Sequence, residues 1–310
     1  MEYKEILEAA RKNTAPHCMA CPVCNGKACG NNVPGPGCKF PGATAARNYD
    51  KWQEIFVNMD TLCENVEPNV SFELFGRSFS APIFVAPLGA VDMHYGPKYN
   101  DLSYNAELMR AAVDCGILAF TGDGINPDIM RDAVRESASA VGGLTIPTIK
   151  PWSREVVFDK LDGVIANDIF AAAMDVDGAG LPFLKKLGGK AGSKSVEEMR
   201  EIIEHAGRPF IIKGIMTVAG AKKAVEAGAA GIVVSNHGGR VQGGVPSTAE
   251  VLGEIADAVL IGRPFATMMY GAGGEGVKVL FDKLVGELKG TMTMCGAASL
   301  KDISRDMIRI

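Results

Sequence analysis

The sequence lacks the features of several classes of protein. It has no basic run that could neutralise a row of phosphates, and its 32 Lys and Arg residues are outnumbered by 36 Asp and Glu residues, for a formal net charge of −4. These properties argue against nucleic-acid binding. No apolar run approaches the roughly 20 residues that a membrane-spanning helix needs. The N-terminal stretch MEYKEILEAARKN is charged throughout and lacks the apolar core of a secretion signal, so a cytoplasmic protein without a membrane span is expected.

The length of 310 residues allows a substantial hydrophobic core, in one large α/β domain or two ordinary ones. A short helix is expected over about Tyr3 to Asn13, and it leads into a Cys-, Gly- and Pro-rich stretch whose turn formers predict irregular loops. We therefore interpret residues 1–80 as an N-terminal lead-in segment and residues 81–310 as the main domain.

The eight cysteines are concentrated near the N-terminus. Without a secretion signal, close spacing favours metal ligation or free thiols over disulfides. The spacing of Cys18, Cys21, Cys24 and Cys29 would allow four thiolates to converge on a zinc ion or an iron–sulfur cluster. The alternative is a reduced loop with scattered thiols, because no second pair of ligands supports a metal site. Both interpretations stay open at this stage.

Short apolar runs alternate with helix-like segments after residue 80. Runs of this length, separated by segments with helical periodicity, indicate buried parallel strands joined by right-handed crossovers. The expected strands are Ala81–Pro87, Gly116–Gly122, Gly143–Lys150, Phe170–Asp177, Pro209–Gly214, Gly231–Asn236 and Ala258–Pro264.

Nearly every expected strand ends in a cluster of polar or glycine residues. This distribution predicts a TIM (β/α) barrel, whose active site is built from the C-terminal ends of its strands. A doubly wound sheet is the alternative, but its sites gather at one switch point. Seven strands are recognisable in the sequence, whereas a closed barrel of this kind has eight.

The stretch GIVVSNHGGR places a histidine and an arginine at the end of a predicted strand. The imidazole of His237 can take a proton near neutral pH, and the guanidinium of Arg240 suits a carboxylate. Gly238 and Gly239 would allow a sharp turn between them. The structural alternative is a histidine that caps the strand and an arginine that pairs with a surface acid.

Two further cations follow predicted strands. Lys213 could hold an anionic ring or a phosphate, or form a Schiff base, although a lysine that only extends its charge to solvent is equally compatible with the pattern. Gly262 and Arg263, with the following GAGGEGV, could present N–H groups and a guanidinium to a phosphate. The Gly271–Gly276 spacing is similar to a dinucleotide-binding fingerprint but does not directly follow a strand, which argues against that function.

Together, the segments KGIMTVAGAKKAVEAGAAGIVVSNHGGR, VLIGRPF and GEGVKVLFDKLVGEL resemble the FMN-dependent α-hydroxy-acid oxidases and dehydrogenases, relatives of glycolate and lactate oxidase. The resemblance extends from roughly Arg47 to the C-terminus. It implies a TIM barrel with FMN at its mouth, a small 2-hydroxy acid as substrate, and a homo-oligomer.

The resemblance also implies roles for individual residues. His237 would take the hydroxyl proton of the substrate, Arg240 would bind its carboxylate, and Lys213 would lie beside the flavin and stabilise its reduced form. Asp177 would orient His237, with Asp175 as the alternative. The implied cofactor-binding residues are Ala86, Pro87, Leu88, Gly89, Thr121, Lys213, Ser235, Gly262 and Arg263.

The chain departs from the family in one large feature. A βα unit with an Asp-Gly-Gly-x-Arg motif, which supplies much of the FMN phosphate site, is absent, and the segment Ala256–Val259 is interpreted as a junction left by its deletion. Losing a barrel strand leaves two unpaired edges, so we expect lower stability, self-association or weaker FMN binding.

Smaller departures concern the substrate. Pro147-Thr148-Ile149 replaces the usual Gln-x-Tyr, and the second carboxylate-binding Arg is absent, with Lys185 and Lys186 as the nearest cations. The main hypothesis is FMN-dependent oxidation of a 2-hydroxy acid. The alternatives are an impaired or non-catalytic barrel that binds flavin weakly and a Schiff-base aldolase that uses Lys213.

Overall fold

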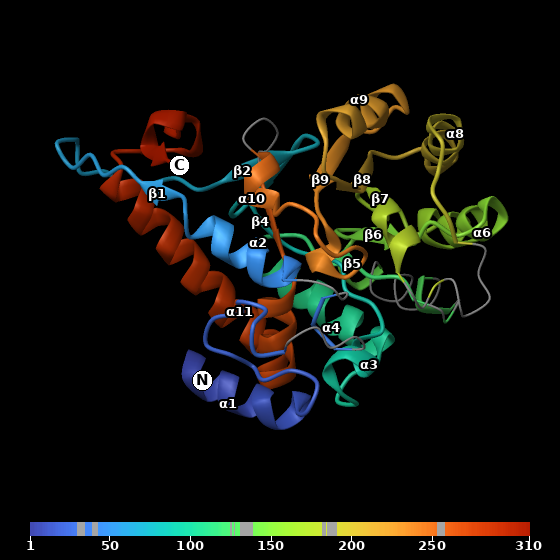
Figure 1. Cartoon of the computed structure of the whole chain (residues 1–310), viewed down its shortest axis with the longest axis horizontal. Coiled ribbons are helices and arrows are strands. Elements are labelled where there is room, and N and C mark those ends of the chain that lie inside the picture. Colours follow the sequence, from blue (N-terminus) through green and yellow to red (C-terminus); the bar gives the residue numbers. More distant parts are fainter. Residues whose placement is uncertain are drawn as a thin grey trace.

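The computed structural model describes residues 1–29, 35–38, 43–124, 126, 128–130, 139–181, 184, 191–252 and 258–310. Seven parallel strands lie at its centre (Figure 1). They are β4 (Ile83–Val85), β5 (Phe120–Thr121), β6 (Ile146–Ile149), β7 (Ala172–Asp175), β8 (Phe210–Ile215), β9 (Gly231–Val234) and β10 (Val259–Ile261). Six of them lie within runs expected from the sequence, and β8 extends one residue beyond its expected run, to Ile215, so those strand predictions are confirmed.

The strands form a single arc. β5 to β9 pair in chain order, and β10 pairs with β4 in parallel register, Leu260 opposite Phe84. A parallel bridge between Val85 and Ala119 joins these two groups. The resulting order is β10-β4-β5-β6-β7-β8-β9, which is the strand order of a (β/α) barrel with one position unfilled. The barrel prediction is thus confirmed, and the alternative of a doubly wound sheet is not.

The unfilled position lies between β9 and β10. No strand among the described residues pairs with the outer edge of either one. Every residue of β7 is buried, whereas every residue of β9 is only partly buried and Val259 on β10 is 44% exposed. The edges are therefore less covered than the middle of the arc.

α6 packs beside β6, α9 packs beside β8 and β9, and α8 contacts both of these helices, whereas α11 runs along one side of the molecule and packs against α1 (Figure 1). Several helices begin at a residue whose side chain caps the free backbone N–H groups. Ser195, for example, accepts a hydrogen bond from the N–H of Glu198 at the start of α8. The helices are α1 (Tyr3–Thr14), α2 (Thr44–Trp52), α3 (Val91–Tyr95), α4 (Asp101–Asp114), α6 (Arg154–Ile165), α8 (Val196–Ala206), α9 (Val218–Glu226), α10 (Thr248–Val251) and α11 (Arg263–Met294).

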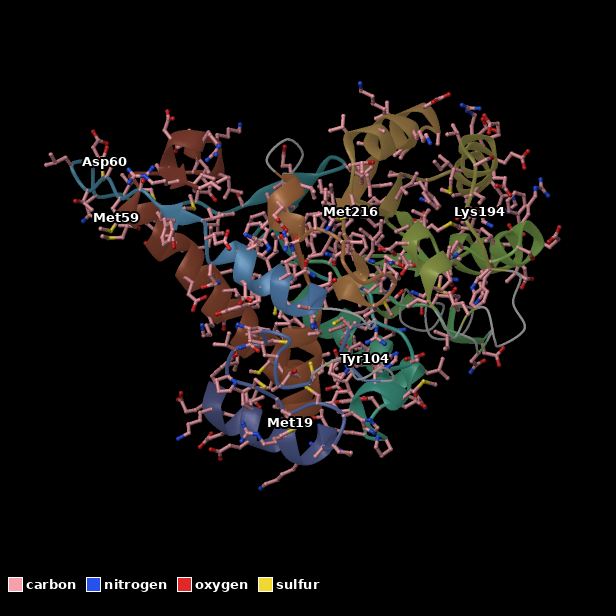
Figure 2. All side chains as sticks on the ribbon, in the orientation of Figure 1. Met19, Met59, Asp60, Tyr104, Lys194 and Met216 are labelled. Carbon is pink, nitrogen blue, oxygen red and sulfur yellow. The ribbon has the colours of Figure 1, made fainter. Side chains whose placement is uncertain are left out.

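Shorter elements complete the described chain. They are the strands β1 (Phe56–Val57), β2 (Phe72–Leu74), β3 (Arg77–Phe79) and β11 (Ile308–Arg309) and the 3₁₀ helices η2 (Val176–Gly180), η3 (His237–Gly239), η5 (Leu300–Asp302) and η6 (Arg305–Met307). β1 pairs with β11, and the segment after β1, which carries Met59 and Asp60, projects from the body (Figure 2). No helix in the described part of the chain is both long and apolar enough to span a membrane.

The glycines of GAGGEGV serve packing. They lie inside α11, which changes direction at Gly273, where φ is +58°. Gly271 abuts the backbone of Ile6, so a side chain there would collide with α1. Gly271 therefore allows α11 to pack closely on α1, and Gly273 and Gly274 lie against Glu107 and Ala111 of α4, so the spacing of these glycines is explained by packing.

Candidate active site

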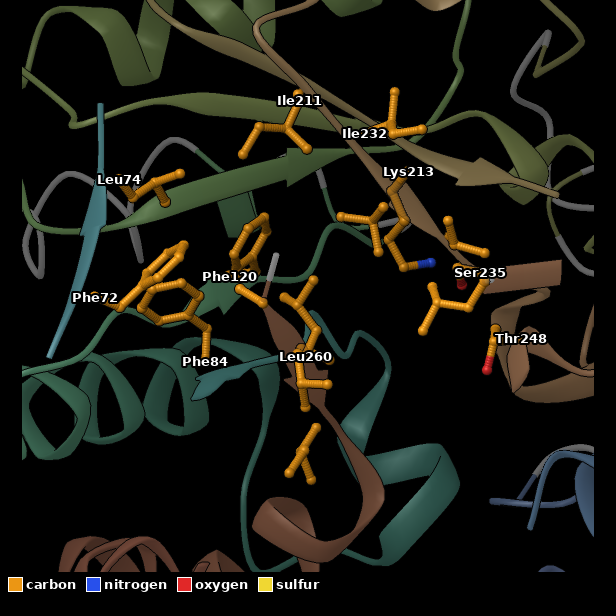
Figure 3. A pocket seen from close by; sticks show the side chains of 18 of the residues that line it. Phe72, Leu74, Phe84, Phe120, Ile211, Lys213, Ile232, Ser235, Thr248 and Leu260 are labelled. Carbon is orange, nitrogen blue, oxygen red and sulfur yellow. The ribbon is translucent and has the colours of Figure 1, made fainter. Parts of the chain in front are cut away.

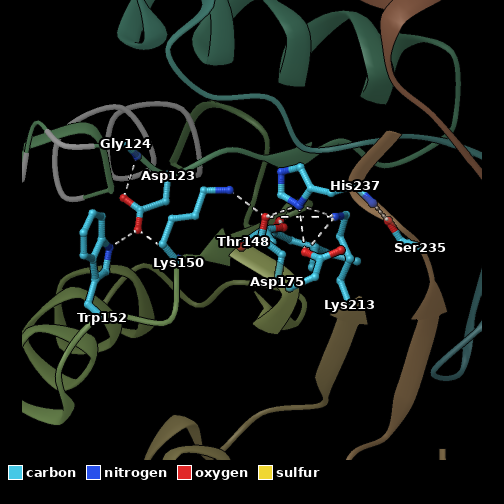
Figure 4. A network of polar contacts seen from close by, with 11 residues as sticks. Asp123, Gly124, Thr148, Lys150, Trp152, Asp175, Lys213, Ser235 and His237 are labelled. Atoms are coloured by element: carbon cyan, nitrogen blue, oxygen red, sulfur yellow. Dashed lines mark hydrogen bonds and ion pairs between the residues drawn. The ribbon is translucent and has the colours of Figure 1, made fainter. Parts of the chain in front are cut away.

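His237 lies directly beyond β9 and faces a pair of carboxylates (Figure 4). Its Nδ1 is 2.7 Å from Oδ1 of Asp177, and its backbone N–H donates to Oγ of Ser235. Gly238 and Gly239 follow with φ values of +64° and +80°, as the predicted sharp turn requires. A side chain at Gly239 would come within 2.9 Å of Cys38 and Thr44, so this turn also packs against the N-terminal segment.

Lys213 and Asp175 complete the cluster around the imidazole. The ammonium of Lys213 is 3.8 Å from Asp177, 4.0 Å from Asp175 and 3.5 Å from Nδ1 of His237. Asp175 Oδ2 is 3.7 Å from the same Nδ1. The contact with Asp177 is a full ångström shorter, so the Nδ1–H donates to Asp177 and the lone pair of the neutral ring lies on Nε2.

Burial and charge act together on the ionisable groups of this cluster. Burial lowers the pKa of His237, and the Lys213 ammonium lowers it further, against the opposing effect of Asp177. Burial alone would raise the pKa of Asp177, but Lys213 and His237 outweigh it and lower that pKa to about 2. At neutral pH the cluster therefore holds an ionised Asp177 beside a neutral His237 that is able to accept a proton.

Arg240 is not in hydrogen-bonding contact with this cluster. Its guanidinium donates to the carbonyl of Gly35 and lies 3.0 Å from Nε2 of His94 on α3. Burial lowers the pKa of His94 to about 3, with Arg240 adding to the effect, so His94 stays neutral. His94 was not predicted as a site residue, because its position in the sequence gives no sign of this contact.

A cavity of about 1820 Å³ opens between β9 and β10 beside the cluster. Its inner end is apolar, with Phe72, Leu74 and Phe84, and Lys213 and Ser235 lie at its other end (Figure 3). Of the residues selected from the sequence as cofactor ligands, those that line the cavity are Ala86, Lys213, Ser235 and Arg263.

Buried polar atoms without partners point to a polar ligand here. Among the described residues, Oγ1 of Thr121, Oδ1 of Asp175 and Oδ2 of Asp177 are buried and have no hydrogen-bond partner. Such atoms are rare in proteins unless a ligand or water satisfies them. Lys213 and Arg263 line the cavity and supply the positive charge that a flavin phosphate and reduced ring would need, so the residues present fit FMN, although the βα unit is missing.

The remaining residues predicted from the sequence to bind the cofactor or substrate do not line this cavity or are not described by the structure. Pro87, Leu88 and Gly89 follow β4, and Gly89 approaches the backbone of Asp123 so closely that a side chain would not fit. Gly262 precedes α11. Lys185 and Lys186 fall outside the described residues.

The four N-terminal cysteines do not form a recognisable metal site. In the described part of the chain, no three of these thiols lie within 4.8 Å of one another. Cys24 instead lines the cavity. The geometry thus gives no support to zinc or an iron–sulfur cluster at Cys18, Cys21, Cys24 and Cys29.

The buried carboxylate of Asp123 holds the segment that follows β6 in place. Asp123, which is 0% exposed, accepts hydrogen bonds from the Lys160 ammonium at 2.8 Å, the Trp152 indole at 2.6 Å and the Lys150 backbone at 3.0 Å (Figure 4). Lys160 is itself only 6% exposed. Removing either charge would leave the other buried without its partner.

We expect Asp123→Ala to lower the free energy of unfolding by about 3–5 kcal/mol, measured by urea denaturation. The matched control is Glu201→Ala, which removes a carboxylate from an ion pair with Arg154 whose side chains are both more than half exposed. That change should cost less than about 1 kcal/mol. Equal losses in the two variants would contradict a special role for Asp123.

Comparisons with known proteins identify the class of the fold and then the family. Two crystal structures of mandelate oxidase superpose with TM-scores of 0.72 and 0.74, over 97% of this chain and 96% of theirs, at 23% and 22% sequence identity. This likeness establishes the fold. A profile of the FMN-dependent dehydrogenases matches residues 37–179, 183–259 and 256–310. The chain belongs to this family.

Relatives with known names match over a shorter stretch. L-lactate dehydrogenase of Acinetobacter baumannii is 38% identical over 145 residues, which take in 37% of this chain and 38% of the relative. The peroxisomal (S)-2-hydroxyacid oxidase of Arabidopsis thaliana is 37% identical over 145 residues, 37% of this chain and 39% of the relative. The matched region thus spans well under half of either relative.

The same comparisons support the deletion inferred from the sequence. Each alignment is 145 residues long, but the part of this chain within it is only 37% of 310 residues and is therefore shorter than 145 residues. Part of the aligned stretch of each relative thus has no counterpart in this chain. The family profile matches residues 256–259 twice, once at the end of one segment and once at the start of the next. Both findings are expected if two similar segments were joined at Ala256–Val259.

Proposed function

We propose that the protein oxidises a small 2-hydroxy acid to the 2-oxo acid, with FMN bound in the cavity between β9 and β10. The observation that carries the proposal is the short contact between His237 and Asp177, which leaves Nε2 of a neutral imidazole as a base. When bound, FMN supplies the acceptor for the hydride from the substrate carbon.

The chain's own residues bind the groups and move the proton. Lys213 and Arg263, which line the cavity, are the cations available to the cofactor. His237 takes the substrate hydroxyl proton on Nε2, and ionised Asp177 stabilises the imidazolium that results. Arg240 binds the substrate carboxylate in exchange for one of its present contacts, the carbonyl of Gly35.

The test is an absorbance spectrum of the protein with added FMN, followed by anaerobic addition of lactate or glycolate. We expect flavin bands that bleach with the hydroxy acid. Flavin bands that do not bleach would contradict the proposed oxidation. No flavin binding would identify the chain as the impaired barrel that the missing unit suggests; family membership gives no support to the aldolase alternative.

A further inference from the structure

Lys150 lies at the end of β6, on the opposite side of the carboxylate pair from Lys213 (Figure 4). Its ammonium is 2.6 Å from Oδ2 of Asp175. The side chains of Lys150 and Asp175 are 12% and 3% exposed, so this ion pair is shielded from solvent. Such pairs interact more strongly than surface pairs and hold their geometry more closely.

The position of Lys150 is fixed by the fold. Its backbone N–H donates to Asp123, the same buried carboxylate that binds Lys160 and Trp152. Lys150 therefore presents its ammonium to Asp175 from an anchored segment.

Asp175 is the competing carboxylate at His237. Its Oδ2 is 3.7 Å from the Nδ1 that bonds to Asp177 at 2.7 Å. Of the cations in the described part of the chain, Lys150 lies nearest to this Oδ2, at 2.6 Å, and Lys213 is 4.0 Å away from it. An Asp175 that lost Lys150 would carry a poorly neutralised charge beside the imidazole.

We propose that Lys150 is a positioning residue: it holds Asp175 away from His237, so that Asp177 alone orients the ring and the ring stays neutral. Among the described residues, the charged and titratable groups around His237 are Lys213 from β8, Asp177 from η2, Asp175 from β7, Lys150 from the end of β6 and neutral His94 from α3. Two carboxylates balance two ammonium groups. Removing one ammonium leaves a net negative charge, which favours protonated His237.

The test is an NMR titration of His237 in the wild-type protein and in Lys150→Met. The chain has four histidines, so the His237 signal can be assigned by its loss in His237→Asn. We expect Lys150→Met to raise the pKa of His237 by about one unit or more. Lys150→Arg keeps the charge and should leave the pKa near the wild-type value. An unchanged pKa in folded Lys150→Met would overturn the proposal.

A second variant gives the opposite sign. Asp175→Asn removes the negative charge with little change of shape and should lower the pKa of His237. In this background, Lys150→Met should shift the pKa of His237 much less than it does in the wild-type background. Shifts of equal size in the two backgrounds would contradict a role exerted through Asp175. If Lys150→Met alone fails to fold, the lowered pKa of His237 in Asp175→Asn still tests the effect of this carboxylate.

The catalytic consequence rests on the proposed function. A base that is active only when neutral loses activity as the pH falls through its pKa, so the acidic limb of kcat/KM should move to higher pH in Lys150→Met and not in Lys150→Arg. A shifted NMR titration in a protein that oxidises no 2-hydroxy acid would support the role of Lys150 and reject the oxidation. A moved acidic limb with an unchanged titration would reject the role of Lys150.

Discussion

Inserting a βα unit at the Ala256–Val259 junction is expected to stabilise the protein by about 3 kcal/mol, since stability is of order 0.1 kcal/mol per residue and such a unit has about 30 residues. A suitable donor is the part of the Acinetobacter baumannii L-lactate dehydrogenase that has no counterpart in this chain. The inserted strand would pair with β9 and β10 and cover edges that are now partly exposed.

The insertion should also tighten FMN binding. The cavity lies between the two edges, so a strand placed there would form one of its walls and bring new polar groups to the end occupied by Lys213 and Arg263. Urea denaturation and a fluorescence titration with FMN measure the two effects. An insert of equal length made of Gly and Ser is the control, since it can close neither edge.

The result of this insertion distinguishes a barrel that merely lacks one unit from a chain whose edge strands have adapted to the loss. A gain in stability and flavin affinity with the βα unit, absent from the Gly/Ser control, would show that the described arc is a barrel lacking one unit. No gain in either quantity would mean that β9 and β10 have adapted to remain edges, and the prediction would be wrong.

Replacing His237 with Asn is expected to lower the rate of anaerobic flavin reduction by a 2-hydroxy acid by about 10²- to 10⁴-fold, which is the usual contribution of a general base. Asn is chosen because His237 has a φ of +57°, a conformation that Asn tolerates better than Ala does. The side chain then lacks a base while the turn before Gly238 is kept.

The control for this variant is His205→Asn on α8. His205 also contacts a carboxylate, Asp162, at 2.7 Å, but it lies on the helical surface and away from the cavity. Flavin reduction in this variant should stay near the wild-type rate. Stopped-flow absorbance measures both variants, and a rate for His237→Asn within a factor of a few of the wild type would exclude His237 as the base.

The strands were predictable because each is a short, buried apolar run whose sequence signal is local. The seven runs predicted all form strands of one arc, and the shortage of one strand was visible as a missing segment of sequence. The contacts between β10 and β4 could not be predicted from local pattern, because they join residues from opposite ends of the barrel domain.

The site was predictable only in part. The sequence motif and the resemblance selected His237, Lys213, Asp175 and Asp177, which the structure brings together. The partners of Arg240, Gly35 and His94, were missed because three distant segments meet there. The sequence shows Lys150 only as a lysine that follows a predicted strand. Its proposed role depends on the ion pair with Asp175, and this contact between two strands could not be read from the local sequence.

Because the arc of strands is open, we expect its middle strands and its edge strands to differ in the free energy of local unfolding. Among the strands that the structure describes, β7 has bonded neighbours on both sides, whereas β9 and β10 each have a neighbour on one side only. Amide hydrogen exchange should therefore be slowest in β7 and faster toward both ends of the arc. Since His237 directly follows β9, the proposed base is attached to one of the first strands to open, and the persistence of the site is limited by fraying at that edge.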